Sequence, residues 1–174
     1  KKNLESNKET EKKGEERDGT TKRIEGMVSM AKSEVENLCY YFPSLLSGVL
    51  EITVPSLRTV INRLGSMGYK FSLTHAAKSC VKTDASCDAI WYVMKKCGTM
   101  ADPDYKPKLN DKMPGYRIWN DETIGHTLTC EQKEKCNLTE DNSETKKFLK
   151  LQNSKIVKYQ ENPKSNWGPM SRPK

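Results

Sequence analysis

The stretch CDAIWYVMKKC, residues 87–97, constrains the fold more than any other part of the chain. A helix over these residues turns both cysteines and the apolar side chains to one side and leaves Tyr92, Lys95 and Lys96 on the other. Ten residues of helix rise about 15 Å, well beyond the ~7 Å limit on the Cα separation of a disulfide. The two sulfurs therefore cannot bond each other, and each is predicted to pair elsewhere, bind a metal or stay a buried thiol.

The chain has six cysteines, and their even number and irregular spacing favour a set of disulfides over a zinc ribbon. Cys130 and Cys136 enclose five polar residues, and this small loop makes them the first candidates for a pair. The spacing leaves the remaining connectivity open, because six cysteines allow fifteen pairings. The disulfide candidates are Cys39, Cys80, Cys87, Cys97, Cys130 and Cys136.

A zinc site is the alternative use of these sulfurs. His126, Cys130 and Cys136 lie close together in the sequence, and one further cysteine would complete a tetrahedral set of ligands. No C-x-x-C pair occurs in the chain, so the spacing favours disulfides, and we predict no metal and no cofactor. Unmodified buried thiols are the third alternative.

Residues suited to catalysis are scarce. The chain has two histidines, His75 and His126, and the local sequence places no nucleophile beside either of them. The glycines of residues 65–68, GSMG, lack the lysine and the spacing of a phosphate-binding loop. No carboxylate pair sits in an apolar context that would suggest acid–base chemistry. The sequence therefore predicts a protein that is not an enzyme and has no catalytic residues.

The periodicity of apolar residues predicts a helical first half. Apolar residues recur at helical spacing in one continuous stripe over residues 24–38, again after Pro55, and over residues 73–81. Pro55 is well suited to the first position of a helix because that position needs no N–H donor. Together with residues 87–97, these segments predict about four helices in a region spanning 23–99.

The pattern becomes alternating in the second half. Residues 124–130 alternate as a half-buried strand would, and KKFLKLQNSKIVKY, residues 146–159, contains two β-leaning runs around a turn. We therefore expect residues 100–160 to form antiparallel β-hairpins packed on the helices. The predicted fold class is α+β, a helical N-terminal half followed by a small antiparallel β region, with disulfide staples.

Composition sets both ends of the chain apart. Residues 1–22 contain one aliphatic side chain, Leu4, among charges of mixed sign, and are predicted to be a disordered leader. Residues 161–174 hold three prolines and are predicted to be an extended basic tail. A mean hydropathy of −0.82 is consistent with such unpacked segments.

The net charge of +7 is concentrated near the C-terminal end. Residues 146–174 carry eight basic residues and one acidic residue, and the lysines alternate with Phe148, Tyr159 and Trp167. This pattern can combine backbone contacts with base stacking on nucleic acid. The alternative is a hairpin whose lysines protect its edges from aggregation. The predicted basic surface consists of Lys146, Lys147, Lys150, Lys155, Lys158 and Lys164.

The even number of cysteines, a first residue other than Met and the sequon at Asn137 favour a secreted protein. A removed signal peptide or excision from a longer chain would account for the first residue, and no run of about 18 apolar residues predicts a membrane span. We expect an extracellular, non-enzymatic glycoprotein, glycosylated at Asn137, that binds a protein partner through its surface. An acidic polymer or nucleic acid is a further possible partner of the basic segment. The alternative is a basic intracellular or viral RNA-binding domain with a structural zinc site.

Overall fold

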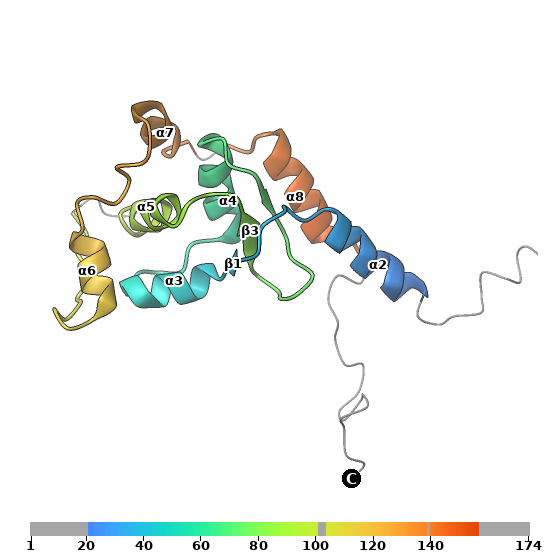
Figure 1. Cartoon of the computed structure of the whole chain (residues 1–174), viewed down its shortest axis with the longest axis horizontal. Coiled ribbons are helices and arrows are strands. Elements are labelled where there is room, and N and C mark those ends of the chain that lie inside the picture. Colours follow the sequence, from blue (N-terminus) through green and yellow to red (C-terminus); the bar gives the residue numbers. More distant parts are fainter. Residues whose placement is uncertain (1–20, 101–103, 139, 157–174) are drawn as a thin grey trace, which may run out of the picture.

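The computed structural model describes residues 21–100, 104–138 and 140–156, which form seven helices and a three-stranded sheet (Figure 1). The helices are α2 (Thr21–Lys32), α3 (Pro43–Leu50), α4 (Leu57–Ser66), α5 (Cys87–Gly98), α6 (Pro114–Asn120), α7 (Cys130–Lys135) and α8 (Ser143–Asn153). The strands are β1 (Tyr40–Tyr41), β2 (Phe71–Ser72) and β3 (Val81–Thr83). No described helix has the length and apolar character needed to cross a membrane.

The sheet is antiparallel with the order β1-β3-β2. Tyr40 pairs with Lys82 on one side of β3, and Phe71 pairs with Thr83 on the other. Val81 and Thr83 are buried while Lys82 between them is partly exposed, which is the alternation expected of a strand with one covered face. The hydroxyl of Thr83 donates to the carbonyl of Lys70 at 2.7 Å, so this buried polar group has a hydrogen-bond partner.

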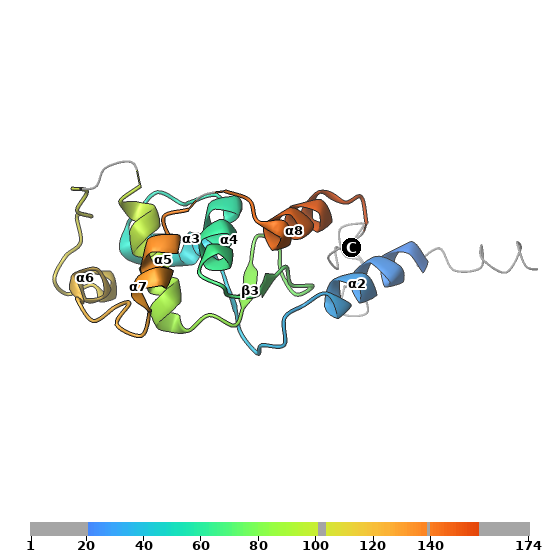
Figure 2. The same cartoon turned by 90° about the horizontal axis from the view of Figure 1, so that it is seen from above.

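Helix α4 lies at the centre of the molecule and packs against α5, α7 and α8, while α3 packs against α5 and α6. In two perpendicular views, α6 lies at one end of the molecule and α2 at the other (Figures 1 and 2). Ser56 caps α4 by accepting from the N–H of Thr59 at 3.0 Å, and the helix then buries Ile61 and Leu64. The core therefore forms around α4, between α5 and the sheet.

The first helix is shorter than its apolar stripe predicts. Helix α2 ends at Lys32, where the hydroxyl of Ser33 donates to the carbonyl of Met30 at 2.8 Å. Its inward residue is Met30, which is fully buried, whereas Ile24 and Val28 of the predicted stripe are 56% and 59% exposed. The predicted continuation of this helix through residue 38 is therefore wrong.

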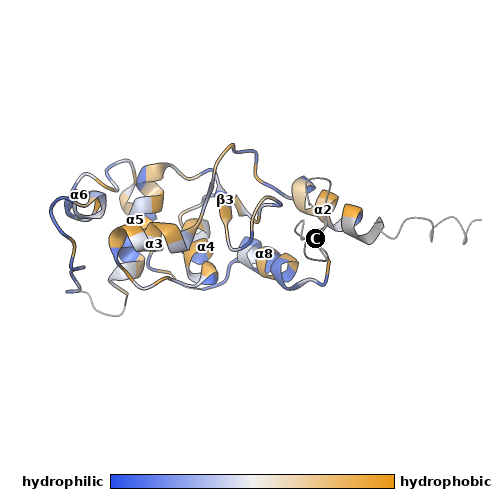
Figure 3. Cartoon of the chain, turned by 90° about the horizontal axis from the view of Figure 1, so that it is seen from below, coloured by the Kyte–Doolittle hydropathy of each residue, from blue (hydrophilic) through white to orange (hydrophobic). Residues whose placement is uncertain are grey.

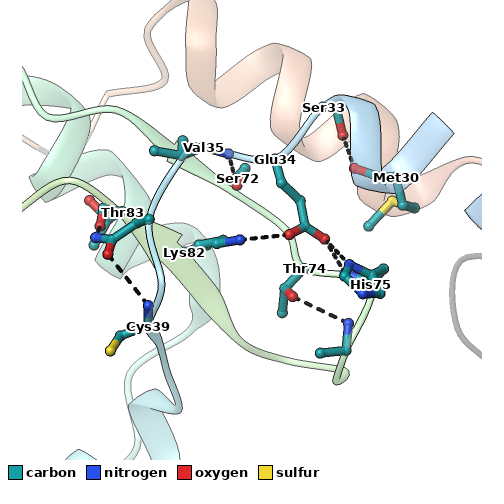
Figure 4. A network of polar contacts seen from close by, with 12 residues as sticks. Met30, Ser33, Glu34, Val35, Cys39, Ser72, Thr74, His75, Lys82 and Thr83 are labelled. Carbon is teal, nitrogen blue, oxygen red and sulfur yellow. Dashed lines mark hydrogen bonds and ion pairs between the residues drawn. The ribbon is translucent and has the colours of Figure 1, made fainter. Parts of the chain in front are cut away.

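The chain leaves α2 because Glu34 bonds to the sheet region instead of continuing the helix (Figure 4). One carboxylate oxygen of Glu34 accepts from Lys82 Nζ at 2.9 Å, and the other lies 2.6 Å from His75 Nδ1 and accepts from the His75 backbone N–H at 2.5 Å. The N–H of Val35 donates to Ser72 Oγ at 2.9 Å. These bonds hold the segment after α2 against β2 and β3.

The predicted β-hairpins of residues 100–160 are wrong, because the described part of this region contains helices α6, α7 and α8 and no strand. Thr129 and Gln132 form a reciprocal capping box that starts α7. Asn142 accepts from the N–H of Thr145 at 2.8 Å and starts α8. The strands lie in the first half instead, where residues 73–80 connect β2 to β3 and Val81 begins β3, although 73–81 is predicted to be helical.

Most of the two predicted terminal segments falls outside the described residues. Residues 1–20 of the predicted leader and all of the predicted tail, 161–174, lie outside the described residues. Thr21 already begins α2, so the last two residues assigned to the leader are helical.

The disulfide staples predicted from the sequence find no support in the structure. All six cysteines lie within the described residues, and none is bonded to another. Cys130 begins α7 and Cys136 caps its end, and six residues of helix rise about 9 Å, beyond the ~7 Å limit for a disulfide. Cys87, predicted to point inward, is exposed at the start of α5. Cys80 is buried, and its thiol donates to the carbonyl of Lys78 at 3.1 Å.

Candidate nucleic-acid interface

The outward side of α5 forms one wall of a cavity of about 410 Å³. Lys95 and Lys96 lie three and four residues after Tyr92, and Thr99 lies four and three residues after them, so the four residues share one face of the helix. The inward face carries the buried residues of the core. The rest of the cavity lining comes from the segment after α5, from α6 and from the loop that follows it: Asp104, Tyr105, Lys106, Trp119 and Ile124.

Tyr105 and Trp119 form an aromatic wall of this cavity. Their ring centroids lie 6.4 Å apart with the planes at 88°, an edge-to-face pair. The hydroxyl of Tyr105 donates to the carbonyl of Glu51 at 3.2 Å, which fixes the ring. Trp119 approaches α5 over Gly98, where a Cβ would lie 3.2 Å from Cη2 of the indole and 2.8 Å from Ile52 Cγ2. A glycine at position 98 therefore lets the wall close against the helix.

The cavity is electropositive, because three lysines and one carboxylate are found among the described residues that line it. Lys95 Nζ donates to the carbonyl of Asp121 at 3.0 Å. Burial lowers the pKa of Lys95, and the nearby acidic groups of Asp121 and Glu122 oppose that shift. Lys96 Nζ lies 5.7 Å from the centroid of the Tyr92 ring, within the range of a cation–π contact. Lys106 is exposed.

The loop after α6 is tied to α5 by Asp88, which lies one turn before Tyr92. Its carboxylate accepts from the N–H of Gly125 at 2.6 Å and from the N–H of Thr127 at 3.3 Å, and also bonds the Thr127 hydroxyl. Burial alone would raise the pKa of Asp88, but these hydrogen bonds hold it below its ordinary value. The carboxylate therefore stays ionised and keeps the loop on the same face of α5 as the cavity.

This arrangement suits binding rather than covalent chemistry. Ammonium groups bind phosphates as point charges, and exposed aromatic side chains stack on bases without regard to sequence. Most known small-ligand pockets have volumes of roughly 300–1,000 Å³, a range that includes this cavity. The described lining contains no histidine, cysteine or serine that could act as a nucleophile or base.

The basic surface predicted from the sequence lies on a different element. Lys146, Lys147 and Lys150 are exposed on α8, which lies well apart from α6 in both views (Figures 1 and 2). Hydrophilic residues colour much of α8 in Figure 3, whereas α3 is largely apolar. Lys147 Nζ pairs with Glu144 at 2.7 Å, which offsets part of its charge. Lys155 is exposed after α8, and the predicted residues Lys158 and Lys164 lie outside the described residues.

The alternative zinc ligands are not brought together. His126 and Cys130 are exposed, whereas Cys136 is fully buried against Arg63 of α4. Arg63 Nη1 lies 3.8 Å from Cys136 Sγ and donates to the carbonyl of the same residue. In the part of the chain that the structure describes, no three His, Cys, Asp or Glu side chains form a group able to hold a metal ion.

Sequence reasoning missed the cavity. The helix prediction correctly placed Tyr92, Lys95 and Lys96 on the outward side of 87–97, but it gave these residues no role in binding. The sequence did contain a signal of a nucleic-acid site, because basic and aromatic residues are interspersed from Tyr92 to Trp119. What the sequence does not contain is the fold of the connector that brings the two groups together.

Comparisons with known proteins point to one family. The model of the family described as N2,N2-dimethylguanosine tRNA methyltransferase (TRM) matches residues 1–95, more than half of the chain. The chain is 42% identical, over 98% of its length, to the mitochondrial tRNA (guanine(26)-N(2))-dimethyltransferase of Saccharomyces cerevisiae. It is 31% identical, over 88% of its length, to the tRNA (guanine(26)-N(2))-dimethyltransferases of Mus musculus and Homo sapiens. The chain spans 30% of the yeast protein and 21% of each mammalian protein. No solved structure shows a significant match.

These matches overturn the functional predictions made from the sequence. The prediction of a secreted, non-enzymatic binding protein is wrong, because the matched family and relatives are enzymes that modify tRNA. The predicted extracellular location is wrong for the same reason, since the relatives are named as tRNA-modifying enzymes and the yeast relative as mitochondrial, and the glycosylation of Asn137 finds no support. A protein partner finds no support, whereas a nucleic-acid partner is consistent with the tRNA that the relatives' names contain.

Proposed function

The chain belongs to the family of N2,N2-dimethylguanosine tRNA methyltransferases, and from that premise we propose that it is a tRNA-binding part of such an enzyme. The relatives are named for the N2 atom of guanine 26 in tRNA, and we propose the same substrate for the protein to which this chain belongs. The role assigned to this part is to hold the RNA.

The observation that carries the proposal is the cavity beside α5, in which Lys95, Lys96 and Lys106 lie next to Tyr92, Tyr105 and Trp119. Lysines supply sequence-independent attraction to phosphates, which dominates the affinity of proteins for nucleic acid. The aromatic side chains supply surfaces on which unpaired bases can stack. Together the two kinds of contact suit an RNA that has unpaired bases as well as a phosphate backbone.

The cavity does not fit a sulfonium methyl donor such as S-adenosylmethionine. Three ammonium groups would repel the positive charge of the sulfonium, and Asp104 is the one carboxylate among the described lining residues. The described lining residues also include no glycine that could form a cradle for the rest of such a donor. We therefore assign no step of methyl transfer to these residues.

Binding of the 174-residue chain to tRNA tests the proposal. We expect the logarithm of the association constant to fall linearly with the logarithm of salt concentration, with a slope of about −0.7 to −0.9 for each phosphate neutralised. Fluorescence anisotropy of labelled tRNA measures it, and circular dichroism of the same sample checks that the chain is folded. Heparin of equal charge is the control competitor. The proposal would be contradicted if the folded chain did not bind tRNA at low salt. It would also be contradicted if heparin displaced the labelled tRNA from the chain as well as unlabelled tRNA does.

A further inference from the structure

We propose that the cavity beside α5 binds one unpaired nucleotide of an RNA chain. The base lies against the aromatic wall of Tyr105 and Trp119, and the adjoining phosphate lies beside Lys96 and Lys106. The inference rests on the proposed function and names the feature of the RNA that this site takes.

The shape of the cavity selects an unpaired nucleotide. Its volume of about 410 Å³ is of the size that holds one small ligand and is far smaller than a double helix needs. In a duplex, both faces of a base are covered by its stacked neighbours, so a base reaches an aromatic wall inside a cavity only when it is unpaired and turned out. Trp119 is partly exposed and so remains accessible to such a base.

The walls of the site are fixed before any ligand arrives. The hydrogen bond from Tyr105 to Glu51 and the close approach of Trp119 to Gly98 hold the aromatic wall. Tyr92, another lining residue, is held by Gly125, which contacts its ring and is bonded to Asp88. A ligand that enters therefore orders few side chains, which lowers the entropy lost on binding.

The charges of the site are available to a phosphate. Lys95 already donates to the carbonyl of Asp121 at 3.0 Å. Lys96 and Lys106 form no ion pair with another described residue, and both line the cavity. Two ammonium groups without an ion-pair partner therefore line the same cavity as an aromatic wall, and a nucleotide can use both, its phosphate with the lysines and its base with the rings.

Matched lysine variants of the 174-residue chain test the inference. Lys106 lines the cavity, whereas Lys108, two residues away on the same exposed segment, does not. The probe is a labelled single-stranded RNA heptanucleotide, with a blunt-ended duplex of the same sequence and free guanosine monophosphate as competitors. We expect Lys106→Ala to weaken heptanucleotide binding about fivefold and to reduce the salt slope by roughly one. Lys108→Ala should change the affinity for the heptanucleotide by less than about twofold.

Tryptophan fluorescence gives a second readout. The heptanucleotide should quench part of the emission of the wild-type chain, and Trp119→Phe should lose that part because the stacking indole is gone. Trp119→Leu should weaken binding about fivefold or more, within the range measured for loss of one base–aromatic stack. Since Trp119 also packs over Gly98, the variant on exposed Lys106 keeps the test independent of folding.

Three results would overturn the inference. Equal effects of Lys106→Ala and Lys108→Ala would remove the cavity from the RNA interface. A duplex that competes as well as the single strand would exclude an unpaired nucleotide. Guanosine monophosphate that competes at the same concentration as the heptanucleotide would make a free nucleotide the ligand. If tRNA binding persists in any of these cases, this inference alone fails; if the folded chain binds no tRNA, the proposed function fails with it.

Discussion

Gly125 contacts Tyr92 so closely that a Cβ at Gly125 would lie 2.6 Å from Cδ2 of the tyrosine ring. Gly125 also has a φ of +88°, in the left-handed region that favours glycine. The contact sets the loop after α6 onto the outward side of α5, where Tyr92 also lines the cavity. The position of this loop therefore depends on the absence of a side chain at residue 125.

We predict that Gly125→Ala lowers the free energy of unfolding by about 2 kcal/mol or more. The left-handed backbone costs an alanine about 1 kcal/mol, and relief of the overlap with Tyr92 costs a further 1–3 kcal/mol or so. Urea unfolding followed by circular dichroism measures the change.

Gly68 provides the matched control for this substitution. Its φ is +89°, and no atom lies within 4 Å of the place a Cβ would take. Gly68→Ala should therefore cost only the backbone term, about 1 kcal/mol. Equal losses in the two variants would show that the contact with Tyr92 is not tight.

The ion pair of Glu34 and Lys82 predicts a pH dependence of stability. The Glu34 side chain is 6% exposed and that of Lys82 is 17% exposed. Burial alone would raise the pKa of Glu34, but hydrogen bonds from the His75 backbone, Lys82 and the His75 ring lower it below its ordinary value of 4.5. A carboxyl whose pKa is lowered by folding stabilises the protein above its unfolded pKa, and this contribution is lost as pH falls through the folded pKa.

Glu34→Gln should therefore destabilise the chain at pH 7 by about 2 kcal/mol, the scale of a hydrogen bond to a charged group. The difference from wild type should shrink as the pH falls below 4.5. Urea midpoints at pH 7, 5 and about 3.5 follow this change. Glu36→Gln removes the same charge from an exposed position two residues away, so a comparable loss in that variant would contradict the role given to Glu34.

The cysteines predict two classes of thiol. Burial raises the pKa of Cys97 to about 11, with Arg63 opposing the shift, and burial also raises the pKa of Cys80 and Cys136. A thiol reagent at pH 8 should therefore label Cys80, Cys97 and Cys136 slowly and the three exposed cysteines quickly. The exposed residues are Cys39, Cys87 and Cys130.

Denaturation without reductant completes the thiol test. All six thiols should then react, because the structure shows six free cysteines. Fewer than six reactive thiols would restore the disulfides that the sequence first suggested. Intact mass before and after alkylation gives the count.

The fold was predictable where a helix has both a clear start residue and a continuous apolar face in the sequence. Helix α5 covers 87–97 as its apolar face predicts, and α4 forms as predicted but begins at Leu57, because Ser56 caps it and Pro55 stands before the cap. The second half failed because alternation over a few residues was given more weight than capping. The T-x-x-Q box at Thr129 and the Asn142 cap are local signals that compete with a β pattern and win, since they satisfy helix N–H groups directly.

The rest of the fold depends on contacts that no local pattern contains. The helix predicted over residues 24–38 ends early because Glu34 bonds to His75 and Lys82 in the β2–β3 region, 41 and 48 residues further along the chain. The cavity likewise needs a connector to return Tyr105 and Trp119 to α5. The tRNA-modifying family lay beyond sequence reasoning because this chain spans less than a third of the relatives it matches, and its own motifs identify no reaction.

The lysines of α8 predict a second contact with tRNA, separate from the cavity. Lys146 and Lys150 are exposed on the helix, whereas the charge of Lys147 is partly offset by Glu144. Lys146→Ala combined with Lys150→Ala should weaken tRNA binding about tenfold and reduce the salt slope by roughly two, since each lysine neutralises one phosphate. Lys147→Ala should have a smaller effect than either of the other single substitutions.

Binding of a short RNA distinguishes the contribution of the α8 lysines from that of the cavity. Helices α8 and α6 lie in different parts of the molecule, and α8 and α5 pack on α4, so a dinucleotide held at the cavity should not reach α8, whereas a folded tRNA can span both (Figure 1). The double variant should therefore keep its affinity for the dinucleotide while losing affinity for tRNA. Equal loss for both RNAs would mean that α8 and the cavity bind the same short stretch of RNA. Unchanged tRNA affinity would remove α8 from the interface and leave the cavity to account for binding, because the charges on a solvated helix would then serve solubility alone.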